Sequence, residues 1–252
     1  MPKYYAINLA RSHERWSVLS KSAQAYKIDL TRVEAVDGSF LDPNKWESFD
    51  TEKFKRCNGR PAKPGEYGCY QSHINALNLF LKSGHPTGVI LEDDVLLNSN
   101  LEPFCDFLDK NYKKELLIVR LTSHRIPWFE KQTVRVLGFA IGRCWFGPTG
   151  SSAAYWITRA GAEQLLSKLN PGYLPVDIMI ERSWHHGVDV IQTKPTMLKL
   201  PANNISVIEE DKGNPYYAKF RWYKRFPTYY FRTFELFRRF FYNARSRSIN
   251  FE

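Results

Sequence analysis

Three consecutive carboxylates are the residues of this sequence best suited to chemistry. Glu92-Asp93-Asp94 directly follows the apolar run 88–91, which predicts a buried strand of an α/β sheet. Ligands of such sheets bind beyond the carboxyl ends of the strands. Adjacent acids repel one another, and Mg²⁺ and Mn²⁺ prefer oxygen ligands together with substrate phosphates. We therefore interpret the triplet as a metal–diphosphate site, with a solvated acidic turn as the alternative.

The turn after the first predicted strand suits the phosphates of a nucleotide. Residues 4–9 predict a strand, Ser12 an N-cap, and residues 16–26 an amphipathic helix. Arg11 and Arg15 lie between strand and helix, where guanidinium groups and a helix N-terminus both favour anions. A solvated N-terminal turn explains these residues equally well.

A second helix begins near residue 63 and carries His73. Gly65 and Gly68 lie near its start, where glycine permits a ligand to approach the backbone closely. His73 is expected to face either a ligand or the neighbouring strand, and a satisfied structural histidine is the commoner case. Residues 39–62, before this helix, are polar and irregular, and we expect them to form a mobile connection.

The remaining elements complete an alternating α/β pattern. Asp177 falls in the first turn of a predicted helix, where the helix dipole by itself favours a carboxylate. The expected strands are 31–36, 115–121, 133–137, 153–157 and 188–191, and the expected helices are 101–111, 158–169 and one that begins at 175.

Length and composition indicate a soluble globular protein of one domain, or of one domain plus an appendage. The 252 residues suffice for a large core, and the four cysteines form no C-x-x-C pair, which disfavours a zinc ribbon and fits a reducing cytosol. The N-terminus is too polar for a signal peptide, and no apolar run approaches the roughly 20 residues of a transmembrane helix.

The net charge of +10 is concentrated near the C-terminus. Residues 216–247 hold nine Lys or Arg and one acid, Glu235. Pro227 is expected to split this segment into two helices. An aromatic stripe in the second helix recurs at helical spacing and consists of Tyr230, Phe234, Phe237 and Phe241. The pattern favours an anionic membrane surface as the partner of this segment. The alternatives are packing on the catalytic domain, a homodimer contact and binding of single-stranded nucleic acid. Nothing in residues 1–215 supports nucleic acid.

Six local sequences together resemble glycosyltransferase family 25, the bacterial lipopolysaccharide and lipooligosaccharide glycosyltransferases related to collagen galactosyltransferases. The resemblance covers roughly residues 3–200, and the pairing of GEYGCYQSH with LEDDV is its most specific part. The matching sequences are NLARSHERW at 8–16, AVDG at 35–38, KPGEYGCYQSH at 63–73, VILEDDVLL at 89–97, SSAAYWITRAGAEQLL at 151–166 and LPVDIMIERSW at 174–184.

The resemblance implies a GT-A-like, Rossmann-type mixed sheet flanked by helices over residues 1–210, followed by a basic, aromatic helical tail over 211–252. It also implies transfer of a sugar from a UDP donor with inversion. Glu92-Asp93-Asp94 stands where the family carries a D-x-D metal motif, with Glu in place of the first Asp. Mn²⁺ (or Mg²⁺) is then expected at Asp94 and Glu92.

The same resemblance assigns residues to the donor and acceptor. The expected donor-binding residues are Asn8, Arg11, Arg15, Asp37, His73, Glu92 and Asp93. The acceptor hydroxyl must lose a proton to a general base, for which Asp177 is the first candidate and Glu181 the second.

The sequence therefore predicts a hexosyltransferase, with galactose favoured and glucose next, that extends a lipooligosaccharide or lipopolysaccharide acceptor. Its expected location is peripheral, on the cytoplasmic face of the bacterial inner membrane, with the tail on the anionic surface. A carboxylate-metal nucleotide-sugar phosphohydrolase and a non-catalytic glycan- or membrane-binding module are the alternatives.

Overall fold

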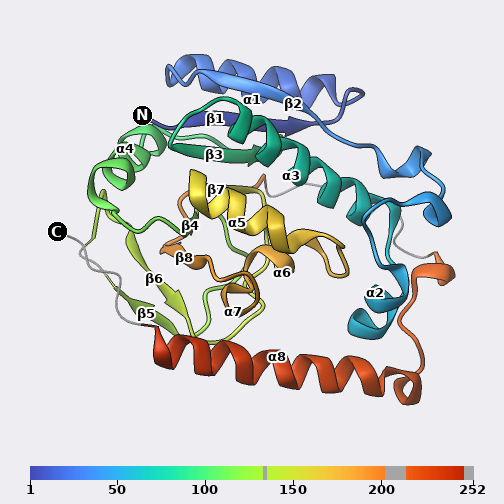
Figure 1. Cartoon of the computed structure of the whole chain (residues 1–252). Helices are drawn as coiled ribbons and strands as arrows, with labels where there is room; N and C mark the ends of the chain where they lie inside the picture. Colours follow the sequence, from blue (N-terminus) through green and yellow to red (C-terminus); the bar gives the residue numbers. More distant parts are fainter. Residues whose placement is uncertain (133–134, 202–213, 247–252) are drawn as a thin grey trace.

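Eight strands form one mixed sheet with helices on both faces (Figure 1). The computed structural model describes residues 1–132, 135–201 and 214–246. This architecture confirms the predicted mixed α/β fold. The strands are β1 Lys3–Asn8, β2 Leu30–Glu34, β3 Thr87–Glu92, β4 Leu117–Arg120, β5 Phe129–Lys131, β6 Ala140–Cys144, β7 Ala154–Thr158 and β8 Asp189–Lys194.

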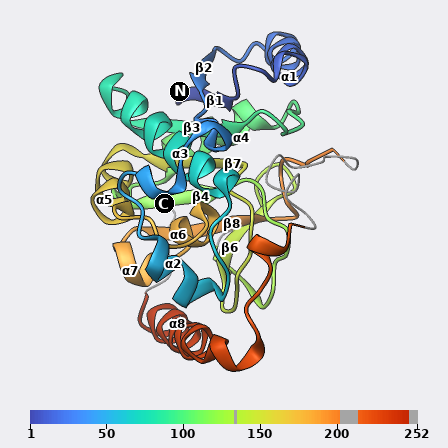
Figure 2. The same ribbon diagram turned by 90° about the vertical axis from the view of Figure 1, so that its right-hand side faces the viewer.

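The strand order brings the ends of β1 and β3 together. Across the sheet the order is β2-β1-β3-β7-β4-β8-β6-β5. β1 is parallel to both β2 and β3, with Ile7 opposite Glu92. β7 is antiparallel to β3 and β4, so the start of β7 meets the end of β3. Side chains that follow β1 and β3 and precede β7 therefore meet at one edge of the sheet, which Figure 2 views face on.

The sheet separates two apolar cores because successive strand residues point to opposite faces. Tyr4 and Ala6 of β1 pack with α1 and α4, whereas Tyr5 and Ile7 pack with α2, α3, α5 and α6. The helices are α1 His13–Ala25, α2 Thr51–Asn58, α3 Pro64–Lys82, α4 Leu101–Asn111, α5 Arg159–Leu169, α6 Val176–Ile180, α7 Ser183–His186 and α8 Phe226–Arg245, with short 3₁₀ turns η1 Gly38–Phe40, η2 Pro43–Lys45, η4 Pro215–Tyr217 and η5 Trp222–Arg225.

Residues 39–62 are ordered and packed, so the expectation of a mobile connection was wrong. The segment contains η1, η2 and α2, and it buries Trp46, Phe49 and Phe54 in the core. Trp46 stacks on Tyr67 of α3 with ring centroids 4.7 Å apart. These three buried aromatic side chains fix the segment although its composition is mostly polar.

The last two strands in the sheet order, β6 and β5, also differ from the expectation. The predicted strand 133–137 is replaced by β5, which pairs with β6, and residues 133–134 lie outside the described residues. β6 escaped prediction because it contains Gly142 and Arg143. Arg143 is buried beside Asp189, with Nη2 2.8 Å from Oδ2, so an ion pair takes the place of apolar alternation.

Pro227 begins a helix and does not separate two. It occupies the first turn of α8, where its missing N–H costs nothing, and the segment before it forms η5. α8 lies along one end of the molecule and contacts α2 and α7 (Figures 1 and 2). The proposed boundary at residue 210 lies outside the described residues.

Candidate functional site

Two cavities meet at the acidic triplet. The first lies over the ends of β1 and β3 and has a volume of about 100 Å³; the second lies between the start of β7 and α6, at about 480 Å³. Cys69, Glu92 and Asp94 line both cavities. Cys69, Glu92 and Asp94 therefore form a wall that the two cavities share, whereas Asp93 lines the first cavity alone.

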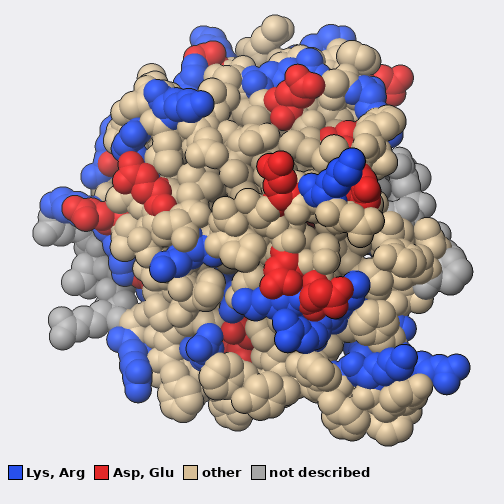
Figure 3. All heavy atoms as spheres, turned by 45° about the vertical axis from the view of Figure 1, so that its right-hand side comes forward, with Lys and Arg blue, Asp and Glu red and all other residues tan. Residues whose placement is uncertain are grey.

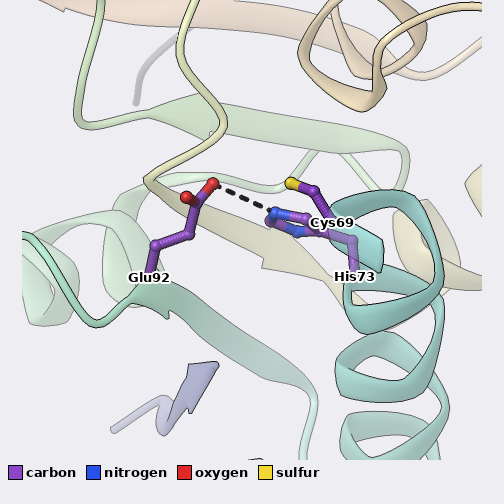
Figure 4. Close-up of side chains that lie close together, drawn as sticks. All are labelled: Cys69, His73 and Glu92. Atoms are coloured by element: carbon purple, nitrogen blue, oxygen red, sulfur yellow. Dashed lines mark hydrogen bonds and ion pairs between the residues drawn. The ribbon is translucent and has the colours of Figure 1, made fainter. Parts of the chain in front are cut away.

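Glu92, the last residue of β3, is held by His73 of α3 and by Ser152 of the loop before β7. It accepts a hydrogen bond from Ser152 Oγ at 2.7 Å, and His73 Nε2 lies 3.3 Å from its Oε1 (Figure 4). The other His73 nitrogen, Nδ1, lies 3.1 Å from the Tyr155 hydroxyl. Burial by itself would raise the pKa of Glu92, but the His73 and Ser152 hydrogen bonds outweigh it and lower that pKa. Glu92 is thus kept ionised, and His73 faces both a strand and the site.

Asp93 turns the other way, toward β1 and α1. Asn8 Nδ2 donates to Asp93 Oδ2 at 2.6 Å, and Arg15 Nη1 lies 3.3 Å from Oδ1. Arg32 of β2 donates through Nε to Asn8 Oδ1 at 3.0 Å and lies over the Trp16 ring. The structure therefore brings Asn8, Arg15 and Asp93 together; that they bind a nucleotide stays a prediction.

Arg11 and Asp37 form an ion pair beside the first cavity. Arg11 Nε lies 2.7 Å from Asp37 Oδ2, and Asp37 also caps η1 by accepting from the Ser39 amide. Burial would raise the pKa of Asp37, but the Ser39 hydrogen bonds and the Arg11 charge lower it. Asp37 lines the cavity as an anion and holds Arg11 beside it.

The glycines at the start of α3 have different tasks from one another. Gly65 lines the first cavity. At Gly68 a Cβ would lie 2.4 Å from the Val36 carbonyl oxygen, so this glycine lets α3 pack on the turn before η1. The proposed approach of a ligand thus applies to Gly65, whereas Gly68 serves helix packing.

The residues at the shared wall fit a divalent ion. Glu92 and Asp94 both line the two cavities, and carboxylates are the ligands that hard cations such as Mn²⁺ and Mg²⁺ prefer. Cys69 Sγ, His73 and Glu92 also offer donor atoms within 4.8 Å of one another. Burial, then the nearby Glu92 and Asp177, raises the pKa of the Cys69 thiol, which makes it a poor ligand beside the carboxylates.

Asp177 lies across the second cavity from the triplet. It occupies the first turn of α6 and lines that cavity with Glu92, Asp94 and His124. Burial raises its pKa, and the charge of Glu181 adds to this, while Arg120 opposes it. A carboxylate with a raised pKa that faces an open cavity has the properties of a general base.

Glu181 does not face either cavity. It is buried, with Oε1 2.7 Å from Arg239 Nη2 and Oε2 3.3 Å from Arg120 Nη1, and Oε2 also accepts from the amide and hydroxyl of Thr149. Burial by itself would raise the pKa of Glu181. The two arginines and the Thr149 hydrogen bonds stabilise its anion more strongly, so the pKa is lowered. The structure therefore gives Glu181 a structural position.

Several residues of the site were not singled out from the sequence. Arg120 donates to the carbonyl oxygens of Gly150 and Ser151 and so holds the loop that presents Ser152 to Glu92. Arg120 follows a fully apolar strand run, as Glu92 does, and that position at a strand end is the signal that could have identified it. Arg239 gave no such signal, because it lies among many arginines of the tail.

Comparisons with known sequences identify the family of this chain. The sequence profile described as "Glycosyltransferase family 25 (LPS biosynthesis protein)" matches residues 1–141. The chain is 27% identical over 181 residues to the "Probable inactive glycosyltransferase 25 family member 3" of Bos taurus, covering 69% of this chain and 30% of the relative. It is 28% identical over 95 residues to "Procollagen galactosyltransferase 1" of Danio rerio, covering 36% and 16%.

The chain thus spans less than a third of the length of these curated relatives, and the match with the family profile covers more than half of the chain. The matched region, residues 1–141, includes the first strand, the turn that carries Arg11 and Arg15, the start of α3, and the acidic triplet. On this evidence the chain belongs to glycosyltransferase family 25.

Proposed function

We propose that this protein is an inverting, metal-dependent glycosyltransferase that moves a hexose from a UDP-sugar to a lipooligosaccharide or lipopolysaccharide acceptor. Galactose is the favoured sugar and glucose the next, since a relative is named as a galactosyltransferase. The observation that carries the proposal is the shared wall: Glu92 and Asp94 separate a cavity beside Arg15 and Asp37 from one that contains Asp177.

The first cavity is assigned to the donor. Arg11 and Arg15 offer guanidinium donors to the diphosphate, and Asn8 and Asp93 keep Arg15 in place. Asp37 accepts hydrogen bonds from sugar hydroxyls, and His73 fixes the direction of Glu92. The cavity itself is narrow, so the nucleotide extends along its open side.

Glu92 and Asp94 would hold the divalent ion, which supplies positive charge to the diphosphate as the leaving group becomes more negative. The acceptor lies in the second cavity. Its hydroxyl oxygen attacks the anomeric carbon as the bond from that carbon to the diphosphate breaks, and Asp177 takes the hydroxyl proton. The attack comes from the face opposite the leaving group and therefore inverts the anomeric centre.

The raised pKa of Asp177 predicts the pH dependence of transfer. The base must be deprotonated, so kcat falls as the pH drops through a pKa that lies above the ordinary Asp value of about 3.9. A kcat profile measured with saturating donor and acceptor should show this acidic limb. A flat profile down to the ordinary carboxyl range would contradict the assignment.

Replacing Asp94 by Ala should abolish metal-dependent binding of the donor. Loss of this carboxylate removes one of the two expected ligands from the shared wall. Calorimetric titration of UDP and of UDP-galactose, with Mn²⁺ and with EDTA, measures the effect. Glu102→Ala on α4, away from both cavities, is the control and should bind as the unmodified chain does. Unchanged binding by Asp94→Ala would refute the metal assignment.

A second candidate is a non-catalytic glycan-binding module on a transferase fold, because one relative is named as probably inactive. The two functions separate in one assay. Metal-dependent binding of a UDP-sugar with release of UDP only when a glycan acceptor is present supports transfer. Binding without turnover supports the module, and release of free sugar without acceptor supports the nucleotide-sugar phosphohydrolase.

A further inference from the structure

The outer face of α8 carries a stripe of solvent-exposed aromatic side chains. Tyr230, Phe234, Phe237 and Phe241 are 75%, 46%, 54% and 53% exposed, and Phe226 at the helix start is 60% exposed. From Phe226 to Phe241 the stripe is about 22 Å long at 1.5 Å per residue. Exposed apolar patches of this kind on otherwise well-packed proteins mark interaction surfaces.

The opposite face of α8 is firmly attached to the body. Arg182 Nη2 donates to Glu235 Oε1 at 3.0 Å, and Thr228 donates to the Arg56 carbonyl oxygen at 2.8 Å. Further along, Arg239 pairs with Glu181. Since polar contacts direct this face inward, the aromatic face stays outward, and exposure of the stripe is not the result of a detached tail.

Charge on the outer face has one sign. Glu235, the only acid in the basic segment 216–246, points toward Arg182 and is 13% exposed. Arg238 lies over the Phe234 ring at 4.6 Å, with Nη1 3.8 Å from Glu235. Uncharged spheres along the lower margin of Figure 3, where α8 lies, have Lys and Arg spheres at both ends. The exposed basic residues of the segment are Lys219, Arg221, Lys224, Arg232, Arg238 and Arg245.

We propose that the outer face of α8, together with η5, docks on the surface of an anionic lipid bilayer. The aromatic rings enter the headgroup region, where Trp, Tyr and Phe are favoured, and the flanking Lys and Arg pair with lipid phosphates. Trp222 of η5, 68% exposed, extends the same apolar surface. Within the described part of the chain no helix is both long and apolar enough to cross a membrane.

Charge complementarity favours this partner over a second copy of the chain. A twofold contact would place the same face on both subunits. The basic flank of one copy would then meet the basic flank of the other, with Glu235 turned inward on both. An anionic surface supplies the missing negative charge, and the inference does not require the proposed catalysis.

Co-sedimentation of the full chain with vesicles tests the proposal. One set of vesicles is phosphatidylcholine alone and the other contains phosphatidylglycerol as well. Pelleting with the anionic set, weakened by salt, is expected. The double variant Phe237→Ser/Phe241→Ser should lower the partition coefficient at least about tenfold. The control pair Phe40→Ser/Trp128→Ser, which is more exposed (82% and 75%) but lies away from α8, should leave it unchanged.

A second pair of substitutions, Lys224→Gln/Arg245→Gln, tests the charge separately from the aromatic rings. It should reduce binding to anionic vesicles and leave the thermal transition in place. Equal partition of all variants, or equal binding to neutral and anionic vesicles, would overturn the proposal. A different result would also overturn it: the unmodified chain does not bind vesicles but forms a dimer in light scattering, and Phe237→Ser/Phe241→Ser dissociates that dimer. The outer face of α8 would then contact a second copy of the chain.

Discussion

Asp177→Asn is expected to lower kcat by about 10²–10⁴-fold, the range for loss of a general base. The amide cannot accept the acceptor's proton, whereas its size and position in the first turn of α6 are retained. Binding of UDP-galactose with Mn²⁺ should change little, because Asp177 lines the second cavity and not the first. Steady-state transfer assays and calorimetry with the same preparation separate the two effects.

A matched control for this substitution is Asp106→Asn on α4, remote from both cavities, which should retain normal turnover. Near-normal kcat for Asp177→Asn would remove Asp177 as the base. Loss of donor affinity together with kcat would instead indicate that Asp177 organises the shared wall with Glu92 and Asp94.

Glu181→Gln is expected to reduce the free energy of unfolding by about 3–5 kcal/mol, since two arginines would remain buried without their counter-charge. The Arg120 and Arg239 side chains are only 3% and 10% exposed. For a chain of this size the loss corresponds to a lower Tm by roughly 10 °C. Chemical denaturation and thermal scans measure it.

Glu163→Gln serves as the control for Glu181→Gln. Its partner Arg159 lies in an exposed i,i+4 pair, with side chains 38% and 56% exposed, so the expected loss is at most about 0.5 kcal/mol. If Glu181→Gln were as stable as this control but lacked turnover, Glu181 would act as the base and the assignment to Asp177 would fail.

The Glu181 network also connects α8 with the loop beside the two cavities. Arg239 of α8 and Arg120 of β4 meet on one carboxylate, and Arg120 holds the loop of Gly150 and Ser151. Ser152, the next residue, donates to Glu92. α8 is therefore a structural part of the α/β body, whichever surface its outer face contacts.

Strands β1, β3 and β7 could be predicted because they are continuous apolar runs buried on both faces, and α3 and α5 because their apolar residues recur at helical spacing. α2 and β6 could not. α2 depends on scattered aromatic anchors from a polar segment, and β6 contains a buried arginine whose partner, Asp189, lies 46 residues away in the sequence. Local periodicity carries no information on such distant pairs.

By itself the sequence determined the kinds of group at the site: three acids after a buried strand, two arginines after the first strand, and an acid at the start of α6. The tertiary structure decided which partner each of these groups contacts. Adjacent acids at a strand end point in different directions, so Asn8 and Arg15 hold Asp93 while His73 and Ser152 hold Glu92.

The same reason separates Asp177 from Glu181. The two acids are one helical turn apart in sequence. Arg239 of the C-terminal helix α8 pairs with Glu181 and helps to bury it, whereas Asp177 lines the second cavity. Which carboxylate is paired and which is exposed depends on charges that only folding brings within a few ångströms.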